Sequence, residues 1–289
     1  VYKRQAAECD RAFEVAMAGV TDAAADAEPG EPANNRPSTL SDRLRTDCRD
    51  LSARLRHLDL LTLPRAPLRI AGGPASPQAH QTPIEYLADL SKGEGILFVP
   101  VGANDRDTPV SGAELRLLCL RLGWGGAHAL AFCGGMAARA LPRRLSTSTS
   151  LTGGWPLHLE ALLFDGPDAE PDERLAALQR RRLAIALARL DLALHCGTID
   201  ADQALSRLLR IEPDQRHAAD RLAQIARSPG DALAAVLGWR LIDAAAAADG
   251  QPPRGASRRL LHDQLLRLGA VPLSLVRAKP WAMGPGMES

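Results

Sequence analysis

The stretch Arg174–His195, RLAALQRRRLAIALARLDLALH, decides the fold class of this chain. Its leucines recur every three or four residues, so a helix would gather them on one face and leave the arginines on the other. The apolar face consists of Leu175, Leu178, Leu183, Leu187, Leu190 and Leu194. Gly197 then stands where a helix that ends in a left-handed residue needs glycine, and Thr198–Asp200 offers a capping residue for a following helix. The pattern predicts an amphipathic helix in a mainly α protein.

Similar helical periods occupy most of the chain on both sides of this stretch. We expect helices at 6–27, Leu40–Leu61, Glu114–Arg139, Thr152–Leu163, Asp214–Arg227, Gly230–Ala248 and Ser257–Leu268, the last closed by Gly269. The segment Glu114–Arg139 is interrupted by Gly123, Gly125 and Gly126, which disfavour helix. Two short apolar segments, Pro67–Ala71 and Gly95–Val101, are strand candidates in a region rich in Pro and Gly. The sequence therefore predicts a mainly α fold with a small irregular sheet.

The amino-acid composition indicates which residues build the core and which classes of binding partner the net charge favours. The 289 residues are 46% apolar but only 3% aromatic, so a large core must be built from Leu, Ala, Val and Ile. Thirty-five basic and 34 acidic residues leave a net charge of +1, which gives no electrostatic reason to expect nucleic acid or an anionic membrane as partner. We expect a helix and Pro-rich break at 1–39, one helical domain at 40–283 and a disordered tail at 284–289.

The cysteine spacing and the hydropathy argue against disulfides, a thiolate zinc site and a membrane-spanning segment. The chain has an odd number of widely spaced cysteines, with no Cys-x-x-Cys pair: Cys9, Cys48, Cys119, Cys133 and Cys196. This pattern predicts neither a disulfide framework nor a thiolate zinc site. No apolar run approaches the roughly 18 residues that span a bilayer. The sequence starts at Val1 without methionine, so we expect that an upstream segment is missing, and the localisation is not readable.

Several local patterns, in order, carry a resemblance to a known family. They are Leu63–Ile70, Gly73-Pro74, Pro83–Tyr86, Gly95–Pro100, Gly126–Leu130, Ser148–Glu160, Asp191–His195, Ser228–Leu233 and Leu261–Asp263. Together they resemble the C-terminal part of the bacterial "domain of unknown function 885" family, which is similar to helical zinc peptidases. The resemblance covers roughly residues 40–277. It implies a multi-helix, zincin-like peptidase scaffold with a small sheet near a cleft.

The resemblance also implies where a zinc site would lie. In the family, the chemistry would sit on a His-Glu-x-x-Pro-Gly-His stretch and on the Glu of Glu-Gly-Trp, since zinc hydrolases use three protein ligands, a metal-bound water and a carboxylate base. Only His128 matches a ligand here. Leu122 stands in the position of the first His, Gly123 in that of the catalytic Glu and Gly153 in that of the third ligand. We therefore expect no catalytic residue and no cofactor, and zinc only if other ligands rebuild the site.

Other polar residues are candidates for lining the cleft: His158, Glu160, Asp191, His195, His262 and Asp263. His158 and Glu160 are two residues apart, about 200° around a helix, so they cannot both bind one ion. Asp191 and His195 share a helix face at i, i+4 and form either a pair that contacts substrate or an intrahelical hydrogen bond. His262 and Asp263 either face the cleft or pack the last helix. The run Arg180–Arg182 is interpreted as a solvated face, with an anion site as the alternative.

Three functions follow from these patterns. The first is a catalytically degenerate metallopeptidase-like protein that holds an extended peptide beside the strand at Ile96–Val99. The second is an active zinc-dependent hydrolase whose replacement ligands come from His128, His158, His195, His262 and Asp263. The third is a helical interaction module without a cleft function. Substrate and oligomeric state are not readable from the sequence.

Overall fold

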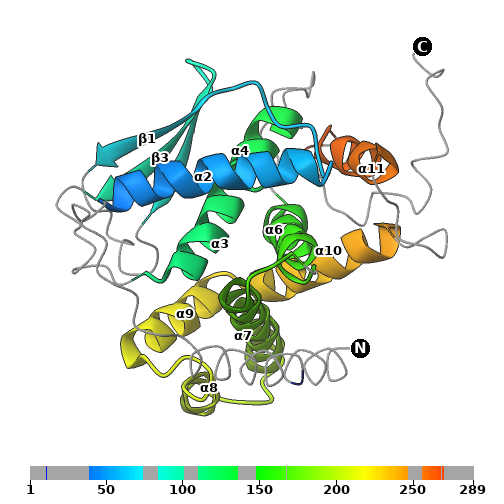
Figure 1. Ribbon diagram of the computed structural model, residues 1–289. Coiled ribbons are helices and arrows are strands. Elements are labelled where there is room, and N and C mark those ends of the chain that lie inside the picture. The colour runs from blue at the N-terminus through cyan, green and yellow to red at the C-terminus, as the bar shows by residue number, and fades with distance from the viewer. Residues whose placement is uncertain are drawn as a thin grey trace.

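The computed structural model describes residues 39–73, 84–100, 110–135, 148–166, 168–246 and 256–267, together with Arg11 and Gly269. These residues form a mainly helical protein with one small sheet, as the periodicity predicts (Figure 1). Apart from Arg11, the helix expected at 6–27 lies outside the described residues, as does the tail at 284–289. No helix among the described residues is long and apolar enough to cross a membrane.

The helices follow the predicted segments with shifted ends. They are α2 (Leu40–His57), α3 (Gly112–Leu122), α4 (Ala127–Ala129), the π-helical turn η1 (Leu130–Gly135), α6 (Thr149–Phe164), α7 (Pro171–His195), α8 (Ala201–Leu208), α9 (Gln215–Arg227), α10 (Asp231–Ala246) and α11 (Ala256–Arg267). Local signals set several ends. Gly197 has φ +67° and Gly269 has φ +71°, as the glycine stop signals predict. The Asp200 side chain caps α8 by accepting a 2.8 Å hydrogen bond from Gln203 N.

The sheet has three strands in the order β1-β3-β2. β1 (Leu68–Gly73) runs parallel to β3 (Glu94–Pro100), and β2 (Glu85–Asp89) runs antiparallel to β3. The sequence predicted β1 and β3 but not β2 as a separate strand. Because β3 pairs on both sides, the prediction that a peptide pairs with Ile96–Val99 is wrong for that strand.

One large core joins the sheet to the N-terminal helices. The helix α2 crosses in front of β3, α3 and α4 (Figure 1). Apolar side chains from α2, β3, α3, α6 and α11 share this core, including Leu44, Leu97, Leu115, Trp155 and Leu265. A second cluster joins α6, α7 and α10, and a third joins α7, α8 and α9. Helices α6 and α7 therefore connect the three clusters, because α6 contributes to the first two and α7 to all three.

The stretch expected at Glu114–Arg139 is broken at the glycines that were predicted to interrupt it. Helix α3 ends at Leu122, and the chain turns at Gly123–Gly126 before α4 and η1. A Cβ atom on Gly126 would lie 1.8 Å from the carbonyl oxygen of Arg121, so the turn folds back against the last turn of α3. Only glycine fits this close approach of backbone to backbone.

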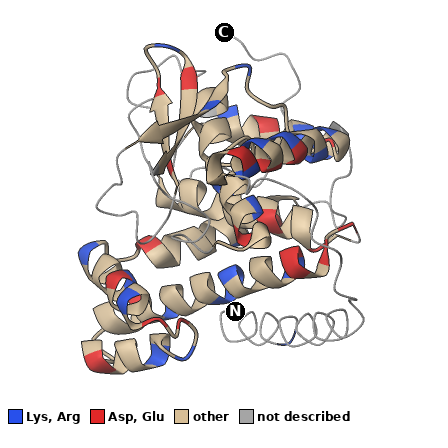
Figure 2. Cartoon of the chain, turned by 60° about the vertical axis from the view of Figure 1, so that its left-hand side comes forward, with Lys and Arg blue, Asp and Glu red and all other residues tan. Residues whose placement is uncertain are grey.

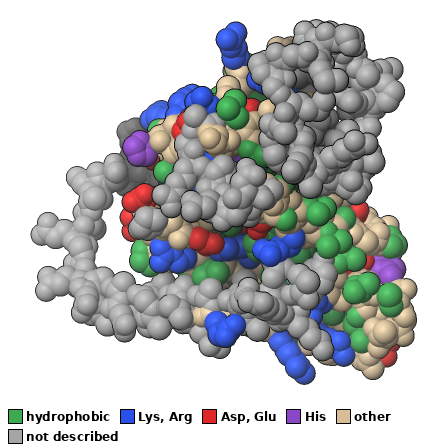
Figure 3. Space-filling view, turned by 90° about the vertical axis from the view of Figure 1, so that its right-hand side faces the viewer, with side chains coloured by type: hydrophobic (Ala, Val, Ile, Leu, Met, Phe, Trp, Pro, Cys, Tyr) green, Lys and Arg blue, Asp and Glu red, His purple; other side chains and the backbone are tan. Residues whose placement is uncertain are grey.

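Charged side chains of both signs share the same helices (Figure 2). The face in Figure 3 likewise shows hydrophobic side chains exposed beside basic and acidic ones. This mixture accords with the near-zero net charge of the chain.

Candidate functional site

His128, the retained residue of the expected metal motif, is fully buried beside the sheet. Its Nε2 lies 2.9 Å from the carbonyl oxygen of Ala66, and its Nδ1 lies 3.1 Å from the hydroxyl oxygen of Tyr86. The rings of Trp124 and Phe132 pack against the imidazole at centroid distances of 5.1 and 4.9 Å. The side chain is therefore enclosed by aromatic rings and bonded at both nitrogens.

These two partners define the tautomer of His128. A carbonyl oxygen can only accept, so Nε2 donates to Ala66, and Nδ1 then accepts from the Tyr86 hydroxyl. Burial lowers the pKa of His128 and raises the pKa of Tyr86, which favours the neutral form of both groups. A neutral imidazole in these bonds has no lone pair left for a metal ion.

Gly95 on β3 makes room for this imidazole. A Cβ atom at position 95 would lie 2.3 Å from Nδ1 of His128 and 2.9 Å from the Tyr86 ring. Glycine at this position therefore lets the strand approach the histidine and its hydroxyl partner closely.

The three other positions of the expected zinc motif hold no side-chain donors and are closely packed. Leu122 packs against the main core. A Cβ atom on Gly123 would lie 2.4 Å from the carbonyl oxygen of Cys119. A Cβ atom on Gly153 would lie 2.6 Å from Cβ of Ala235 on α10. Position 153 therefore faces a neighbouring helix, and a glutamate there would force α6 and α10 apart.

Glycines bring α6 and α10 into close contact over a longer stretch. A Cβ atom on Gly154 would lie 2.4 Å from the backbone nitrogen of Trp239. One on Gly238 would lie 1.7 Å from the carbonyl oxygen of Ser150. The glycine pair at 153–154 in α6 therefore serves a helix crossing.

Glu160 and His158 point into different networks, as their spacing predicts. Glu160 is fully buried, and its Oε1 accepts a 2.7 Å hydrogen bond from Nε of Arg180 and lies 3.9 Å from Nε of Arg121. Burial and the neighbouring charge of Arg180 lower the pKa of Arg121 to about 9. The other oxygen of Glu160 has no partner among the described residues. Glu160 thus balances arginines from α3 and α7.

The interpretation of Arg180–Arg182 as a solvated face is wrong for the middle residue. Arg181 is buried and forms a bidentate ion pair with Asp165 at the end of α6. Arg180, which like Arg181 belongs to α7, forms an ion pair with Glu160 of α6. The arginine side of α7 therefore faces α6 at these positions.

His158 meets His262 across α6 and α11. Their Nε2 atoms are 3.0 Å apart, and both rings are buried. The Nδ1 of His158 lies 2.6 Å from Oδ1 of Asp243, and the Nδ1 of His262 lies 2.6 Å from the carbonyl oxygen of Leu60. Among the described residues, no other two of the expected site histidines are in direct contact.

Asp263 does not share the environment of its neighbour His262. Its Oδ1 accepts a 2.8 Å hydrogen bond from the Thr62 amide, and its Oδ2 accepts a 2.6 Å hydrogen bond from the Thr62 hydroxyl. Asp263 therefore fastens α11 to the segment that precedes β1.

Asp191 and His195 share a helix face, as predicted, with 2.9 Å between Oδ1 and Nδ1. The carboxylate is buried and also accepts hydrogen bonds from the amides of Gly230 and Leu233, at 2.9 and 3.2 Å. These amides belong to the start of α10, where a carboxylate satisfies free N–H groups and interacts favourably with the helix dipole. Asp191 therefore anchors α10 to α7.

The expected histidines thus divide into three environments with different partners. His128 lies with Tyr86, His158 lies with His262, and His195 lies with Asp191. Within the described ranges, no group of three or more His, Cys, Asp or Glu side chains could hold a metal ion.

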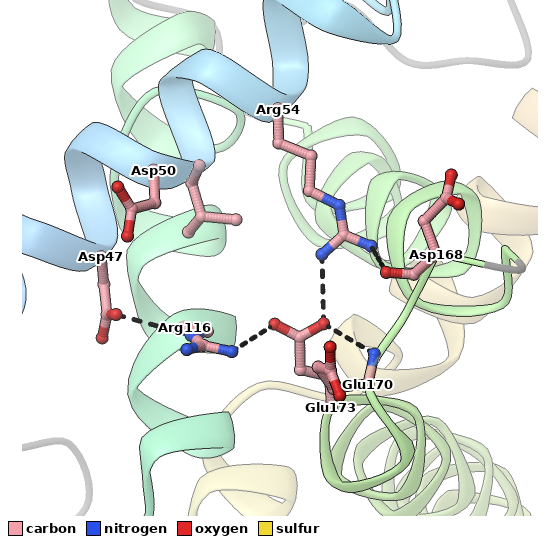
Figure 4. A pocket seen from close by; sticks show the side chains of 8 residues that line it. Asp47, Asp50, Arg54, Arg116, Asp168, Glu170 and Glu173 are labelled. Carbon is pink, nitrogen blue, oxygen red and sulfur yellow. Dashed lines mark hydrogen bonds and ion pairs between the residues drawn. The ribbon is translucent and has the colours of Figure 1, made fainter.

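An open pocket of about 250 Å³ lies between α2, α3 and the start of α7 (Figure 4). Its lining is mainly charged: Asp47, Asp50, Leu51, Arg54, Arg116, Asp168, Glu170 and Glu173. None of these residues was predicted from the sequence to belong to a site. They are spread over three separate segments, and the only local signal is the helix start at Pro171, with acidic residues in its first turn.

Glu173 forms the centre of this pocket. Its Oε1 accepts a 2.7 Å hydrogen bond from Arg116, and its Oε2 accepts one of 3.1 Å from Arg54 (Figure 4). Its side chain is 4% exposed, whereas that of Arg116 is 40% exposed. Burial raises the pKa of Asp47, which lies 3.5 Å from Arg116 at the side of the pocket. The arrangement ties α7 to both α2 and α3.

Comparison with known proteins gives the family. Residues 2–279 match the sequence profile "Bacterial protein of unknown function (DUF885)". No curated protein matches the chain.

Two solved structures share the fold. A putative lipoprotein from Colwellia psychrerythraea has a TM-score of 0.72 at 20% identity, over 95% of this chain and 49% of that one. A putative lipoprotein of unknown function from Shewanella oneidensis has a TM-score of 0.73 at 16% identity, over 94% of this chain and 54% of that one. The chain spans about half the length of these relatives. It belongs to the bacterial DUF885 family.

Proposed function

We propose that this chain is a non-hydrolytic member of its family, with a peptidase-like scaffold that binds an extended peptide without cleaving it. The observation that supports this most directly is the state of His128. Both of its ring nitrogens are used, one by the Ala66 carbonyl and one by the Tyr86 hydroxyl.

Zinc-dependent hydrolysis needs more donors than this region supplies. A catalytic zinc ion takes three protein ligands and keeps one position for water, and a carboxylate accepts the water's proton. Leu122, Gly123 and Gly153 have no side-chain lone pairs. Binding zinc at His128 would also require breaking a buried hydrogen bond, because each of its nitrogens already has a partner.

A hydrolase with replacement ligands is the competing function. Its best starting point is the pair His158–His262, whose Nε2 atoms already face each other. That pair still needs a third donor and an open position for water, and the described residues offer no such third side chain at the pair.

Metal analysis of the purified chain tests the proposal. After incubation with zinc and dialysis, we expect far less than one equivalent of zinc per chain and no hydrolysis of a mixed peptide pool. His128→Gln keeps a polar side chain of similar reach, and His57→Gln on the exposed end of α2 is the matched control. We expect both variants to match the parent in zinc content.

One equivalent of zinc that disappears in His128→Gln but stays in His57→Gln would overturn the proposal. If zinc disappears only in His158→Gln or His262→Gln, the replacement-ligand hydrolase is the better account, provided that peptide hydrolysis disappears with it.

The outer edge of β2 is the place that we propose for the peptide. Among the described residues no strand pairs with this edge, and an extended peptide can add to such an edge by main-chain hydrogen bonds. Leu87 on β2 is 51% exposed and Leu90 just after it is 48% exposed, which gives apolar contacts beside the edge. Both features suit a peptide with apolar side chains.

Fluorescence anisotropy with a pool of labelled, proline-free octapeptides tests this placement. We expect saturable binding that Leu87→Lys weakens by roughly tenfold, because a charge on an edge strand opposes pairing. Leu241→Lys on α10, where the leucine is 47% exposed, should bind as the parent does. Equal weakening by both variants, or no binding by the parent, would contradict a peptide site on β2.

A further inference from the structure

A continuous chain of hydrogen bonds runs through the buried histidine pair. It starts at the Leu60 carbonyl, passes through both nitrogens of His262 and both nitrogens of His158, and ends at the Asp243 carboxylate. His262 is fully buried and His158 is 3% exposed. The two rings are nearly perpendicular at 88°, and the Trp155 ring packs on His262 with its centroid 5.1 Å away.

The partners fix the number of protons in this chain. The Leu60 carbonyl can only accept, so Nδ1 of His262 carries a hydrogen. The contact of 2.6 Å between Nδ1 of His158 and Asp243 also contains one hydrogen. If both imidazoles were neutral and Asp243 ionised, the two Nε2 atoms would face each other with lone pairs. A hydrogen bond between nitrogens 3.0 Å apart needs one more proton.

We propose that His158 and His262 bind one proton between their Nε2 atoms, and that this proton fastens α11 to α6 and α10 as a pH-dependent latch. The charge of the extra proton is balanced by Asp243. The total number of hydrogens in the chain is the same whether the hydrogen between His158 Nδ1 and Asp243 is bonded to the nitrogen or to the carboxylate oxygen.

The surroundings of the two rings assign the donor of the N–H···N bond to His158. Burial, followed by the charge of His158, lowers the pKa of His262 to about 3, so His262 accepts in the N–H···N bond. The Asp243 carboxylate, 31% exposed, faces His158 from α10. The ring beside the Asp243 carboxylate therefore donates in the N–H···N bond, and the ring against the Leu60 carbonyl accepts.

Other charged groups near the pair come from α10, from α11 and from residues 59–62. Arg240 on α10 lies 3.5 Å from Oδ2 of Asp243, and the charge of Arg258 on α11 disfavours protonation of His262. Arg259 on α11 pairs with Asp59 at 2.6 Å, and Asp263 is held by Thr62. These contacts hold α11 against residues 59–62 without the histidines. The shared proton therefore changes how tightly α11 packs but is not the sole attachment of this helix.

Both loss and gain of a proton would open the latch. Removal of the shared proton leaves two lone pairs facing each other at alkaline pH. Addition of a second proton places two N–H groups head to head at acidic pH. We therefore expect the seating of α11 to be tightest at intermediate pH and weaker on both sides.

Side-chain NMR of ¹⁵N-labelled histidine tests the proton count directly. Near neutral pH we expect a hydrogen on Nδ1 of His262 and one hydrogen that couples His158 to His262 through their Nε2 atoms. Absence of the hydrogen between the two Nε2 atoms throughout the neutral range would overturn the proposal. So would one equivalent of bound zinc that is lost in His262→Gln, because a metal ion would then occupy the place of the proton.

Hydrogen exchange of the α11 amides as a function of pH tests the consequence. After correction for intrinsic exchange, opening should be slowest near neutral pH and roughly tenfold faster or more at both extremes. Asp243→Asn, at the partly exposed end of the chain, removes the counter-charge without changing the core. It should shift the alkaline opening to lower pH, whereas His57→Gln should leave the profile unchanged.

A merely structural pair would give a different result. In that case, Asp243→Asn would change the exchange rate equally at every pH, and the profile would show no maximum of protection. Either observation would contradict the latch even if His262→Gln fails to fold.

Discussion

The indole Nε1 of Trp155 donates a 2.7 Å hydrogen bond to the carbonyl oxygen of Gly125. Trp155 is fully buried in α6, and Gly125 is buried in the turn between α3 and α4. This turn occupies the place where the family resemblance implies a helix with two zinc ligands. Its carbonyl lies outside the hydrogen bonds of α3, so α6 supplies the partner that a buried carbonyl requires.

Trp155→Phe removes this donor and leaves a buried carbonyl without a partner. We expect the free energy of unfolding to fall by about 2–4 kcal/mol, from the unsatisfied acceptor and the smaller ring together. The matched control is Trp239→Phe, since Nε1 of Trp239 is buried and has no partner among the described residues. Urea denaturation should show a clearly smaller loss for Trp239→Phe, and equal losses would contradict the role of the hydrogen bond.

Glu173→Gln removes the charge that Arg54 and Arg116 share. Loss of one partner of a buried ion pair costs about 3–5 kcal/mol, but Arg116 is 40% exposed and water screens part of the effect. We therefore expect a loss of about 2–3 kcal/mol by urea denaturation. Asp50→Asn changes an exposed carboxylate of the same pocket and should leave the stability unchanged. A loss in Asp50→Asn as large as that in Glu173→Gln would show that the pocket's overall charge matters more than the buried centre.

The stability should fall as the pH drops below about 6.5. Burial lowers the pKa of His128, and it lowers the pKa of His262 to about 3. Below an unfolded-state pKa of about 6.5, the unfolded chain therefore binds protons that these folded groups do not. The contribution of these two histidines to stability is complete above that pH and is lost on acidification. Each such histidine contributes up to about 1.4 kcal/mol per pH unit.

Chemical denaturation between pH 7.5 and 5 measures this dependence above the range in which carboxylates titrate. In His128→Gln the slope should be smaller by the contribution of one histidine, even if the variant is less stable at every pH. An unchanged slope would mean that His128 is protonated in the folded protein.

Gly238→Ala should disrupt the crossing of α6 and α10. Its Cβ atom would meet the backbone carbonyl of Ser150, which cannot move without shifting a helix. We expect a loss of about 3 kcal/mol or more, at the upper end of overpacking effects. Gly112→Ala at the first residue of α3 is the control, because a Cβ atom there meets no described atom within 4 Å. Thermal unfolding should show that Gly112→Ala is neutral or more stable.

The described cysteines should differ in their reactivity toward iodoacetamide. Cys196 is exposed, whereas Cys48 and Cys119 are buried. The hydrogen bond with Cys48 and burial raise the pKa of Cys119, and burial raises that of Cys133 to about 11. Peptide mapping after labelling at pH 8 should find Cys196 modified first and Cys48 and Cys119 only after unfolding. Fast labelling of Cys119 in the folded chain would show that α2 and α3 separate readily.

Much of the helical framework could be predicted because its signals are local. Leucine spacing identified α7, and glycine or aspartate marked the ends of α7, α8 and α11. The strand β2 was missed because it is short and half-exposed, so its residues carry no clear alternation. The break within Glu114–Arg139 lies at Gly123–Gly126, the glycines that interrupt the predicted stretch, but its apolar residues do not reveal that the chain folds back there.

The candidate site was less predictable for a different physical reason. The separation of His158 from Glu160 follows from helix geometry and is confirmed. The pairing of His158 with His262 joins residues 104 positions apart, and the pairing of Arg54 with Glu173 joins residues 119 apart. The meeting of such distant residues depends on how the helices pack, which no local pattern encodes.

The residues taken one by one are enough to predict that the chain is mainly helical, and they show that Leu122, Gly123 and Gly153 have no side-chain lone pairs. Side-chain chemistry and helical period are properties of each residue and its near neighbours, so they can be read along the chain. Packing of the whole chain gives both nitrogens of His128 their partners, pairs β3 on both edges and brings His158 to His262. These outcomes depend on which groups burial brings within hydrogen-bond distance, and burial is a property of the whole packed chain.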